Sequence, residues 1–79
     1  MKWIIDNIDK PFPHNTEGNY FVWMSEKVFG CSYIQTACVI RGGNGLITII
    51  GDYFANDILS KENFIVAWCE QPKTIEEWM

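Results

Sequence analysis

The segment from residue 41 to residue 68 constrains the fold of this chain more than any other part of the sequence. It opens with Gly42-Gly43-Asn44-Gly45, a run of residues that tolerate the positive φ angles of a tight hairpin turn. The apolar residues 46–50 follow as a return strand, and residues 64–69 have the composition of a second buried strand. Because almost no residues remain between these elements, the segment predicts a small sheet with tight connections.

One short helix is predicted between these two strands, near residues 53–60. Asp52 stands where an N-cap residue would, directly before the helix. Apolar residues four positions apart then give one stripe, which would pack on the sheet. The stripe is made by Phe54 with Ile58 and by Ala55 with Leu59.

Two longer strands are predicted in the first half of the chain. Residues 20–24 are aromatic and β-branched, and both faces of this strand are apolar, so we expect both to be covered. Residues 31–40 form the longest candidate strand, and residues 2–5 form a short strand or an anchoring segment. We therefore expect a single domain over residues 1–79 with an α+β fold. It would contain a small, mainly antiparallel β-sheet of about four strands and one short helix near 53–60.

The ends of the chain add two expectations. Two prolines within residues 9–13 impose an extended path there and exclude a helix. Residues 74–77 have the spacing of a capping box, and a turn there would place Trp78 against the body of the domain.

Composition points to a self-associating protein. The chain has 79 residues, of which 48% are apolar and 15% aromatic, a heavy load for a domain with so little interior. Some apolar surface should stay exposed in a monomer, and a symmetric contact between copies is the simplest way to cover it. The net charge of −4 argues against nucleic-acid binding through phosphate neutralisation. No apolar run approaches the ~20 residues of a membrane span.

The reactive side chains give no catalytic or metal motif. The three cysteines, Cys31, Cys38 and Cys69, are odd in number and include no CxxC pair, so we expect reduced and mostly buried thiols. His14, the only histidine, offers little for a zinc site and is expected to be an exposed loop residue. No motif joins a nucleophile to a base. We expect no enzyme activity, no metal and no cofactor.

Several side chains are candidates for ligand binding. Arg41, the only arginine, precedes Gly42-Gly43, where backbone N–H groups can form a nest for one phosphate; a plain hairpin is the alternative. Aromatic faces can stack purine bases for ~1–3 kcal/mol each, which makes Tyr20, Trp23 and Tyr33 candidates. The large aromatic residues are otherwise expected in the core, namely Phe21, Trp23, Phe54, Phe64 and Trp68.

The order of these elements resembles a known family. An Asn-Gly turn leads into the aromatic strand of residues 18–24, and a Gly-Asn-Gly hairpin precedes an apolar strand. Residues 55–66 are then similar to the motif Ala-Asp-Leu/Met-Leu-Ala-x-Asp-Trp-x-Val of the phage Thoeris anti-defence sponges of the second type. Asp57 to Ser60 stand at its Asp-x-Leu-Ala positions, and Asn63-Phe64 stand at its Asp-Trp positions. The resemblance covers about residues 15–66.

This resemblance implies a phage protein that acts in the cytoplasm of the infected bacterial host. It would be a homo-oligomer that binds and sequesters a cyclic nucleotide immune signal, such as a cyclic ADP-ribose isomer, without cleaving it. Asp57 or Asn56 would project into the pocket and bind a ribose hydroxyl or a base edge. The family's opening amphipathic helix is replaced here by Trp3-Ile-Ile and a Pro-Phe-Pro segment.

A second similarity and a second function stand beside these. Trp3-Ile4, the early prolines and residues 65–68 resemble short phage proteins of unknown function that start with Trp-Ile and end in Trp-Met-Pro-Leu-Pro. The alternative function is a phage inhibitor that binds a host defence protein or nuclease directly through an acidic and aromatic surface.

Overall fold

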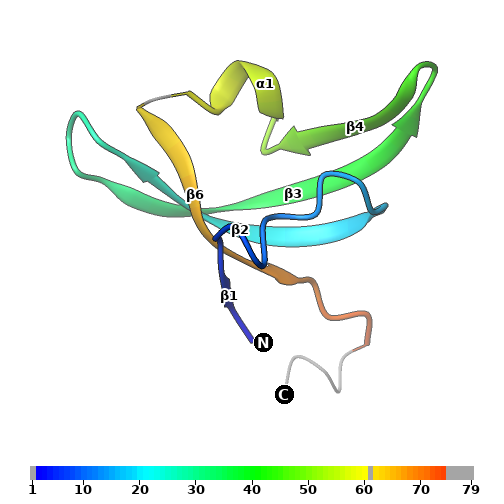
Figure 1. Cartoon of the computed structure of the whole chain (residues 1–79), viewed down its shortest axis with the longest axis horizontal. Helices are drawn as coiled ribbons and strands as arrows, with labels where there is room; N and C mark the ends of the chain where they lie inside the picture. Colours follow the sequence, from blue (N-terminus) through cyan, green and yellow to red (C-terminus); the bar gives the residue numbers. More distant parts are fainter. Residues whose placement is uncertain (1, 61, 75–79) are drawn as a thin grey trace.

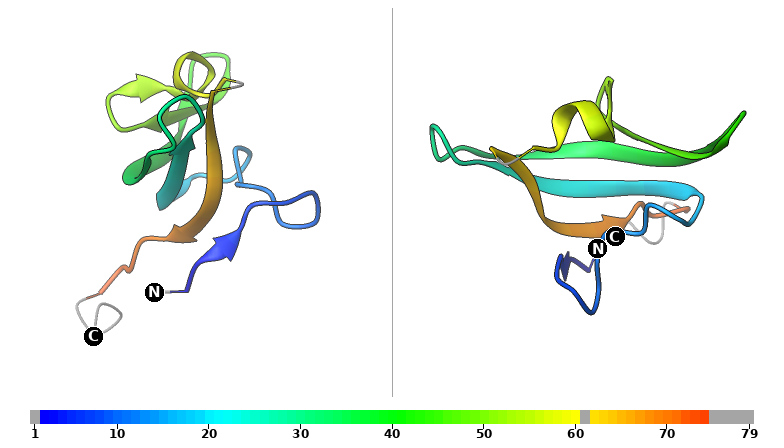
Figure 2. Two further views of the ribbon diagram at one scale, coloured as in Figure 1. Left: turned by 90° about the vertical axis from the view of Figure 1, so that its left-hand side faces the viewer. Right: turned by 45° about the horizontal axis from the view of Figure 1, so that its top comes forward.

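The computed structural model describes residues 2–60 and 62–74, which form one antiparallel sheet and one short helix (Figure 1). The predicted capping-box turn and Trp78 lie outside the described residues. The sheet order is β1-β6-β2-β3-β4-β5, and Figure 2 shows β1 at one edge of the stack and α1 at the other. The elements are β1 Ile4–Ile5, β2 Gly18–Glu26, β3 Ser32–Gly42, β4 Gly45–Ile50, β5 Tyr53–Phe54, α1 Ala55–Ile58 and β6 Asn63–Glu70.

The predicted sheet is confirmed as mainly antiparallel with one short helix, but the expected number of about four strands is wrong. The four long strands of the structure are the predicted ones. Of the other two strands, β1 lies within residues 2–5, where the sequence predicts a short strand or an anchoring segment, and β5 is not predicted. Each has only two residues, too few to carry an alternating pattern. The helix is also shorter than predicted, because Tyr53–Phe54 pair with Ile50 and Ile49 of β4. Phe54 therefore occupies the N-cap position without a side-chain cap bond, and Asp52 stays in the preceding turn.

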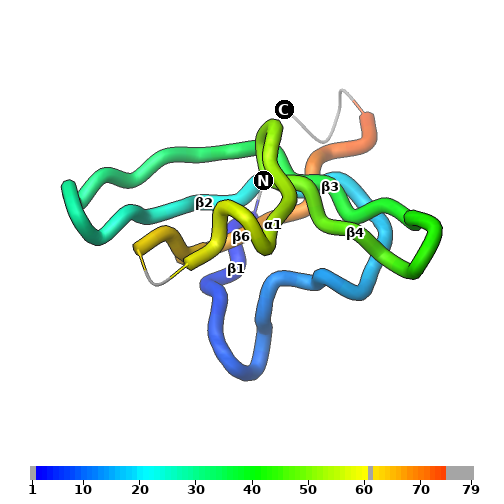
Figure 3. Tube along the Cα trace, turned by 90° about the horizontal axis from the view of Figure 1, so that it is seen from above, coloured from blue at the N-terminus to red at the C-terminus, as the bar shows by residue number. Residues whose placement is uncertain are grey.

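Two hairpins set the register of the sheet. β3 and β4 are joined by the two-residue loop Gly43-Asn44, with Gly42 paired to Gly45. The predicted hairpin is confirmed, and Gly45 has φ = +127°, a conformation that suits glycine. The loop residues Gly43 and Asn44 have no positive φ, so the expected turn chemistry holds at Gly45 alone. The loop 27–31 joins β2 to β3, and Figure 3 shows the two hairpin ends at opposite ends of the molecule.

The core lies on one face of this sheet. Alternating residues of the central strands are buried there, and Phe12 and Ala55 pack over them from the 9–16 segment and from α1. The strand residues of this cluster are Tyr20, Val22, Met24, Ala37, Val39 and Ile50. We call this side of the sheet the core face and the opposite side the outer face.

Phe12 is held over the core face by two hydrogen bonds that link it to β6 through Asp6. Its N–H donates to the Asp6 carboxylate at 2.7 Å, and the Asp6 N–H donates to the Val66 carbonyl at 2.9 Å. Val66 is an extra residue in β6, since Trp23 pairs with Ala67 while the next residue of β2 pairs with Ile65. The carbonyl of this bulge residue is the group that binds Asp6, so the bulge anchors the 9–16 segment over the core face.

The expectation that both faces of β2 are covered is wrong. Tyr20, Val22 and Met24 are buried on the core face, whereas Trp23 on the outer face is 42% exposed. Most of the aromatic residues predicted for the core are likewise outside it. Phe54 and Phe64 are exposed, and Phe21 is half-buried on the outer face. Trp68 is half-buried but packs against the core cluster, as predicted. The cysteines also differ from expectation, because Cys69 is buried but Cys38 is half-buried and Cys31 is exposed; all three are free.

Candidate functional site

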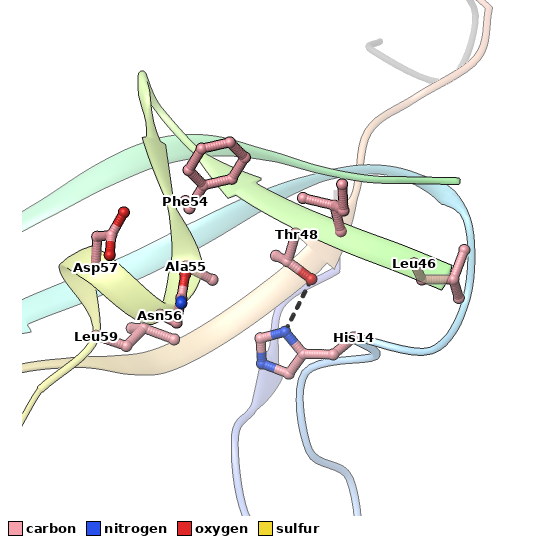
Figure 4. Close-up of a pocket in the computed structure, with 9 residues that line it drawn as sticks. His14, Leu46, Thr48, Phe54, Ala55, Asn56, Asp57 and Leu59 are labelled. Atoms are coloured by element: carbon pink, nitrogen blue, oxygen red, sulfur yellow. Dashed lines mark hydrogen bonds between the residues drawn. The ribbon is translucent and has the colours of Figure 1, made fainter. Parts of the chain in front are cut away.

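The first candidate site is an open groove of about 630 Å³ beside the free edge of β4, which we call the α1 groove (Figure 4). Leu46 and Thr48 of β4 lie along one side, and Asn56 and Asp57 of α1 lie on the other. β5 pairs only with Ile49 and Ile50, so the edge of β4 from residue 45 to residue 48 has no neighbouring strand in the described structure. The groove therefore combines apolar side chains with a few polar groups.

His14 closes this groove from the 9–16 segment. Its Nδ1 lies 3.0 Å from the Thr48 hydroxyl oxygen, and its ring packs edge-on against Phe12 at 4.8 Å between centroids. Although His14 has an exposed surface, its partial burial lowers the pKa of the imidazole, while the nearby Asp6 charge works in the opposite direction. A neutral ring at pH 7 can hydrogen-bond to a ligand but does not attract an anion.

Of the six residues that the sequence suggested for a ligand site, only Asn56 and Asp57 line the same groove. Arg41 forms an ion pair with Glu17 at 3.3 Å, and both side chains are exposed. The Arg41 guanidinium is therefore engaged with a carboxylate, and its residue lines a separate, shallow hollow.

The three aromatic candidates are also separated. Tyr20 is 2% exposed, and its hydroxyl donates to the Thr16 carbonyl at 3.1 Å, so the ring belongs to the core. Burial raises the pKa of its hydroxyl, and the Glu70 charge adds to this effect. Trp23 lies on the outer face, away from Tyr20. Tyr33 is half-buried against the core cluster.

A second groove, of about 520 Å³, lies where β1 and the end of β6 meet. Three of the five lysines of the chain line it, together with Trp68, and we call it the lysine groove. Its lining consists of Lys2, Ile4, Lys10, Trp68, Glu70, Gln71, Pro72 and Lys73.

The walls of the lysine groove are held by contacts between distant parts of the chain. Ile4 of β1 pairs with Trp68 of β6, which places Lys2 at the same edge of the sheet. The Trp68 indole N–H donates to the Lys10 carbonyl at 3.3 Å. The Gln71 side chain donates to the Tyr20 carbonyl at 3.0 Å. Trp68 is half-buried and packs edge-on against Tyr20 and Phe12, so its ring has a fixed orientation.

The charge of this groove is opposite to that of the protein. Among residues 2–60 and 62–74, three lysines and one carboxylate, that of Glu70, line it, whereas the whole chain carries −4. Sequence reasoning missed it because Lys2, Lys10 and Lys73 are far apart in the chain. The pairing of the two-residue strand β1 with β6 and the hydrogen bond from Trp68 to the Lys10 carbonyl bring them together. No local sequence pattern predicts such a pairing.

The structure offers two further observations on function. In the described ranges 2–60 and 62–74, no group of three or more His, Cys, Asp or Glu side chains is placed to hold a metal ion. None of the helical structure in those ranges is long and apolar enough to cross a membrane.

Comparison of the chain with models of protein families, with characterised proteins and with solved structures gave no match. The resemblance to anti-defence sponges therefore stays a prediction that rests on the residues quoted for it.

Proposed function

We propose that the protein is a non-catalytic binding protein that sequesters a cyclic nucleotide signal, as phage anti-defence sponges do. It would act in the cytoplasm of an infected bacterial host. The observation that carries this proposal is the lysine groove, an electropositive hollow with an aromatic wall on an acidic protein. Sequestration needs a preorganised pocket and no catalytic group.

The chemistry of the lysine groove suits a nucleotide. Lys2 and Lys10 supply ammonium groups for phosphate oxygens, and the ring of Trp68 offers a surface for a base. The indole hydrogen bond to the Lys10 carbonyl fixes one cationic residue beside the aromatic wall before any ligand arrives. A volume of about 520 Å³ lies within the usual range for small-molecule sites.

The α1 groove is a poorer phosphate site, although it contains two of the predicted residues. Asp57 brings a negative charge to its lining, no lysine or arginine of the described part of the chain lines it, and His14 has a lowered pKa. Asn56 and Asp57 would suit an uncharged sugar or base edge instead. In the proposal, the anionic part of a ligand therefore binds in the lysine groove.

The test is calorimetric titration with cyclic ADP-ribose isomers and cyclic dinucleotides. We expect the double variant Lys2→Gln/Lys10→Gln to weaken the affinity at least tenfold, which corresponds to ~1.4 kcal/mol. The control is Lys27→Gln, which removes one positive charge from a side chain that lies over the Phe64 ring, outside the groove. Control and wild type should bind alike.

Heat denaturation followed by mass spectrometry should then release the ligand with unchanged mass. A cleaved product would show catalysis and contradict sequestration. Wild-type protein that binds none of these nucleotides would reject the proposal, and equal loss in Lys27→Gln would reject the assignment to the lysine groove.

The alternative function, an inhibitor that binds a host protein, is favoured by one feature. The β2–β3 hairpin ends in two exposed apolar side chains, Val28 at 60% and Phe29 at 83%. Their backbone N–H groups donate to the Glu26 carboxylate at 2.7 and 2.8 Å, so the tip is held in one shape. Under this alternative, a host protein co-purifies with the wild type and with Lys2→Gln/Lys10→Gln, but not with Phe29→Ser.

A further inference from the structure

The outer face of the sheet carries several large apolar side chains. Three cross-strand pairs of large side chains run across it, from β2 to β5: Trp23 with Ile34, Ile40 with Ile47, and Ile49 with Phe54. Four of these six side chains are exposed, with Trp23 at 42%, Ile34 at 57%, Ile40 at 46% and Phe54 at 51%. A surface of this kind on a monomer usually marks a contact with another molecule.

The outer face carries no charge on its central strands. Residues whose side chains alternate onto this face of β2 and β3 are all uncharged, since Arg41 and Glu26 fall on the alternate positions. In β4 the two outer positions are isoleucines. Two copies of a protein with a charge of −4 repel each other at most orientations, but these faces can meet without bringing like charges together.

The size of the outer face reaches the lower end of what a stable dimer needs. From Ile34 to Ile40 the face extends about 20 Å along β3, and the five strands that lie side by side at the level of Ala37 span about 19 Å across it. This footprint of about 400 Å² is enlarged by the relief of the projecting side chains. The accessible area therefore approaches the ~600 Å² per partner at the lower end of stable interfaces.

We propose that a second copy of this chain covers the outer face, so that two sheets pack face to face in a twofold dimer. Sheets stacked in this way lie ~10 Å apart and bury side chains from both inner faces. One patch serves both partners, so no separate complementary surface is required. This proposal does not depend on nucleotide binding.

The dimer leaves the lysine groove open to solvent. Trp68 and Glu70, which line that groove, alternate onto the core face through their pairing with Val22 and Tyr20. Each protomer would therefore keep a complete groove of its own. The groove would not be shared between subunits, because the interface and the groove lie on opposite faces of one sheet.

The test is the mass in solution, measured by light scattering and sedimentation at micromolar concentration. We expect twice the chain mass of 9.2 kDa for the wild type and the single chain mass for Ile34→Glu. Ile34 is exposed and lies outside the core cluster, so the variant should keep the circular dichroism of the wild type. The matched control is Ile8→Glu, the same change at a residue that is 95% exposed and lies outside the sheet, and it should remain dimeric.

A second variant keeps the test independent of folding. Thr36 is exposed, polar and located on the outer face opposite Phe21, so Thr36→Lys adds a charge to the interface without removing an apolar contact. It should also give the single chain mass. A monomeric wild type overturns the proposal, as does a folded Ile34→Glu or Thr36→Lys variant that remains fully dimeric. Equal dissociation in Ile8→Glu would likewise overturn it, because the effect would then be one of net charge alone.

Discussion

His14 links the stability of the protein to pH. The fold holds its imidazole near Thr48 and Phe12, and burial there lowers its pKa below the usual 6.5. Because the folded state disfavours the protonated ring, the unfolded state takes up the proton first as the pH falls. The contribution of His14 is therefore complete above pH 6.5 and is lost as the pH falls through the lowered pKa.

We expect the free energy of unfolding to decrease from pH 7 towards pH 5 more steeply in the wild type than in His14→Gln. Urea denaturation at several pH values measures this difference, and the ring proton signals of His14 report its pKa directly by NMR. A pKa above the usual 6.5, or identical slopes in the two proteins, would show that the ring is not desolvated in solution.

The allocation of aromatic residues shows where sequence reasoning ends for single side chains. In β2, Tyr20, Val22 and Met24 alternate with Phe21 and Trp23, and both sets are apolar. Periodicity therefore predicts a strand but does not decide which set faces the core. The decision comes from Phe12, which lies outside the strand, in the proline-containing segment before it, and packs on Tyr20 at 5.2 Å between ring centroids.

The β3–β4 hairpin should depend on Gly45 much more than on Gly43. Gly45 has φ = +127°, which an L side chain rarely adopts, whereas Gly43 has no such angle and no neighbour that an added methyl group would meet. We expect Gly45→Ala to lower the free energy of unfolding by about 1–3 kcal/mol. Gly43→Ala is the matched control and should change it by less than about 0.5 kcal/mol.

Thermal and urea denaturation of both variants measure this contrast. If the two alanine variants have equal stability, the turn in solution does not have the conformation described here.

The hairpins and long strands could be predicted because their signals are local. Gly42 to Gly45 carry the turn chemistry, and the runs that follow and precede it have strand composition. The short elements are predicted less completely. The sequence indicates a short strand or anchoring segment at residues 2–5 and a helix near 53–60, but it does not indicate β5. The lengths of β1, β5 and α1, which are two, two and four residues, depend on contacts with β6 and β4. The predicted cap at Asp52 failed for the same reason, since strand pairing by Tyr53–Phe54 takes the positions of the first helical turn.

The sheet as a body should be most resistant to opening at β2. This strand pairs with β3 on one side and with β6 on the other, while β4 has a neighbour on its far side only at Ile49 and Ile50. We expect the slowest amide hydrogen exchange in β2 and β3, and exchange faster by at least tenfold in β5 and α1. Exchange followed residue by residue by NMR provides the test. Protection of α1 equal to that of β2 would mean that helix and sheet open as one unit.

The residues of the candidate sites could also be predicted only where they are neighbours in the sequence. Asn56 and Asp57 could be placed in one groove from sequence because they are neighbours on one helix. Lys2, Lys10 and Trp68 could not, because their proximity requires β6 to pair with both β2 and β1. Non-local strand pairing thus determines which charges meet, and composition gives only the number of charges available.

The bulge at Val66 makes β6 tolerant of a change in chain length. Removing one residue from a strand normally turns every later side chain to the opposite face. β6 already holds one residue more than its partner, so a deletion of Val66 would join Ile65 to Ala67 with each still on its present face. The deletion would remove the Val66 carbonyl, which accepts a hydrogen bond from Asp6 and thereby holds the 9–16 segment over the core. At position 66 the sheet can therefore lose a residue and keep its strand register, although the 9–16 segment would be held less firmly.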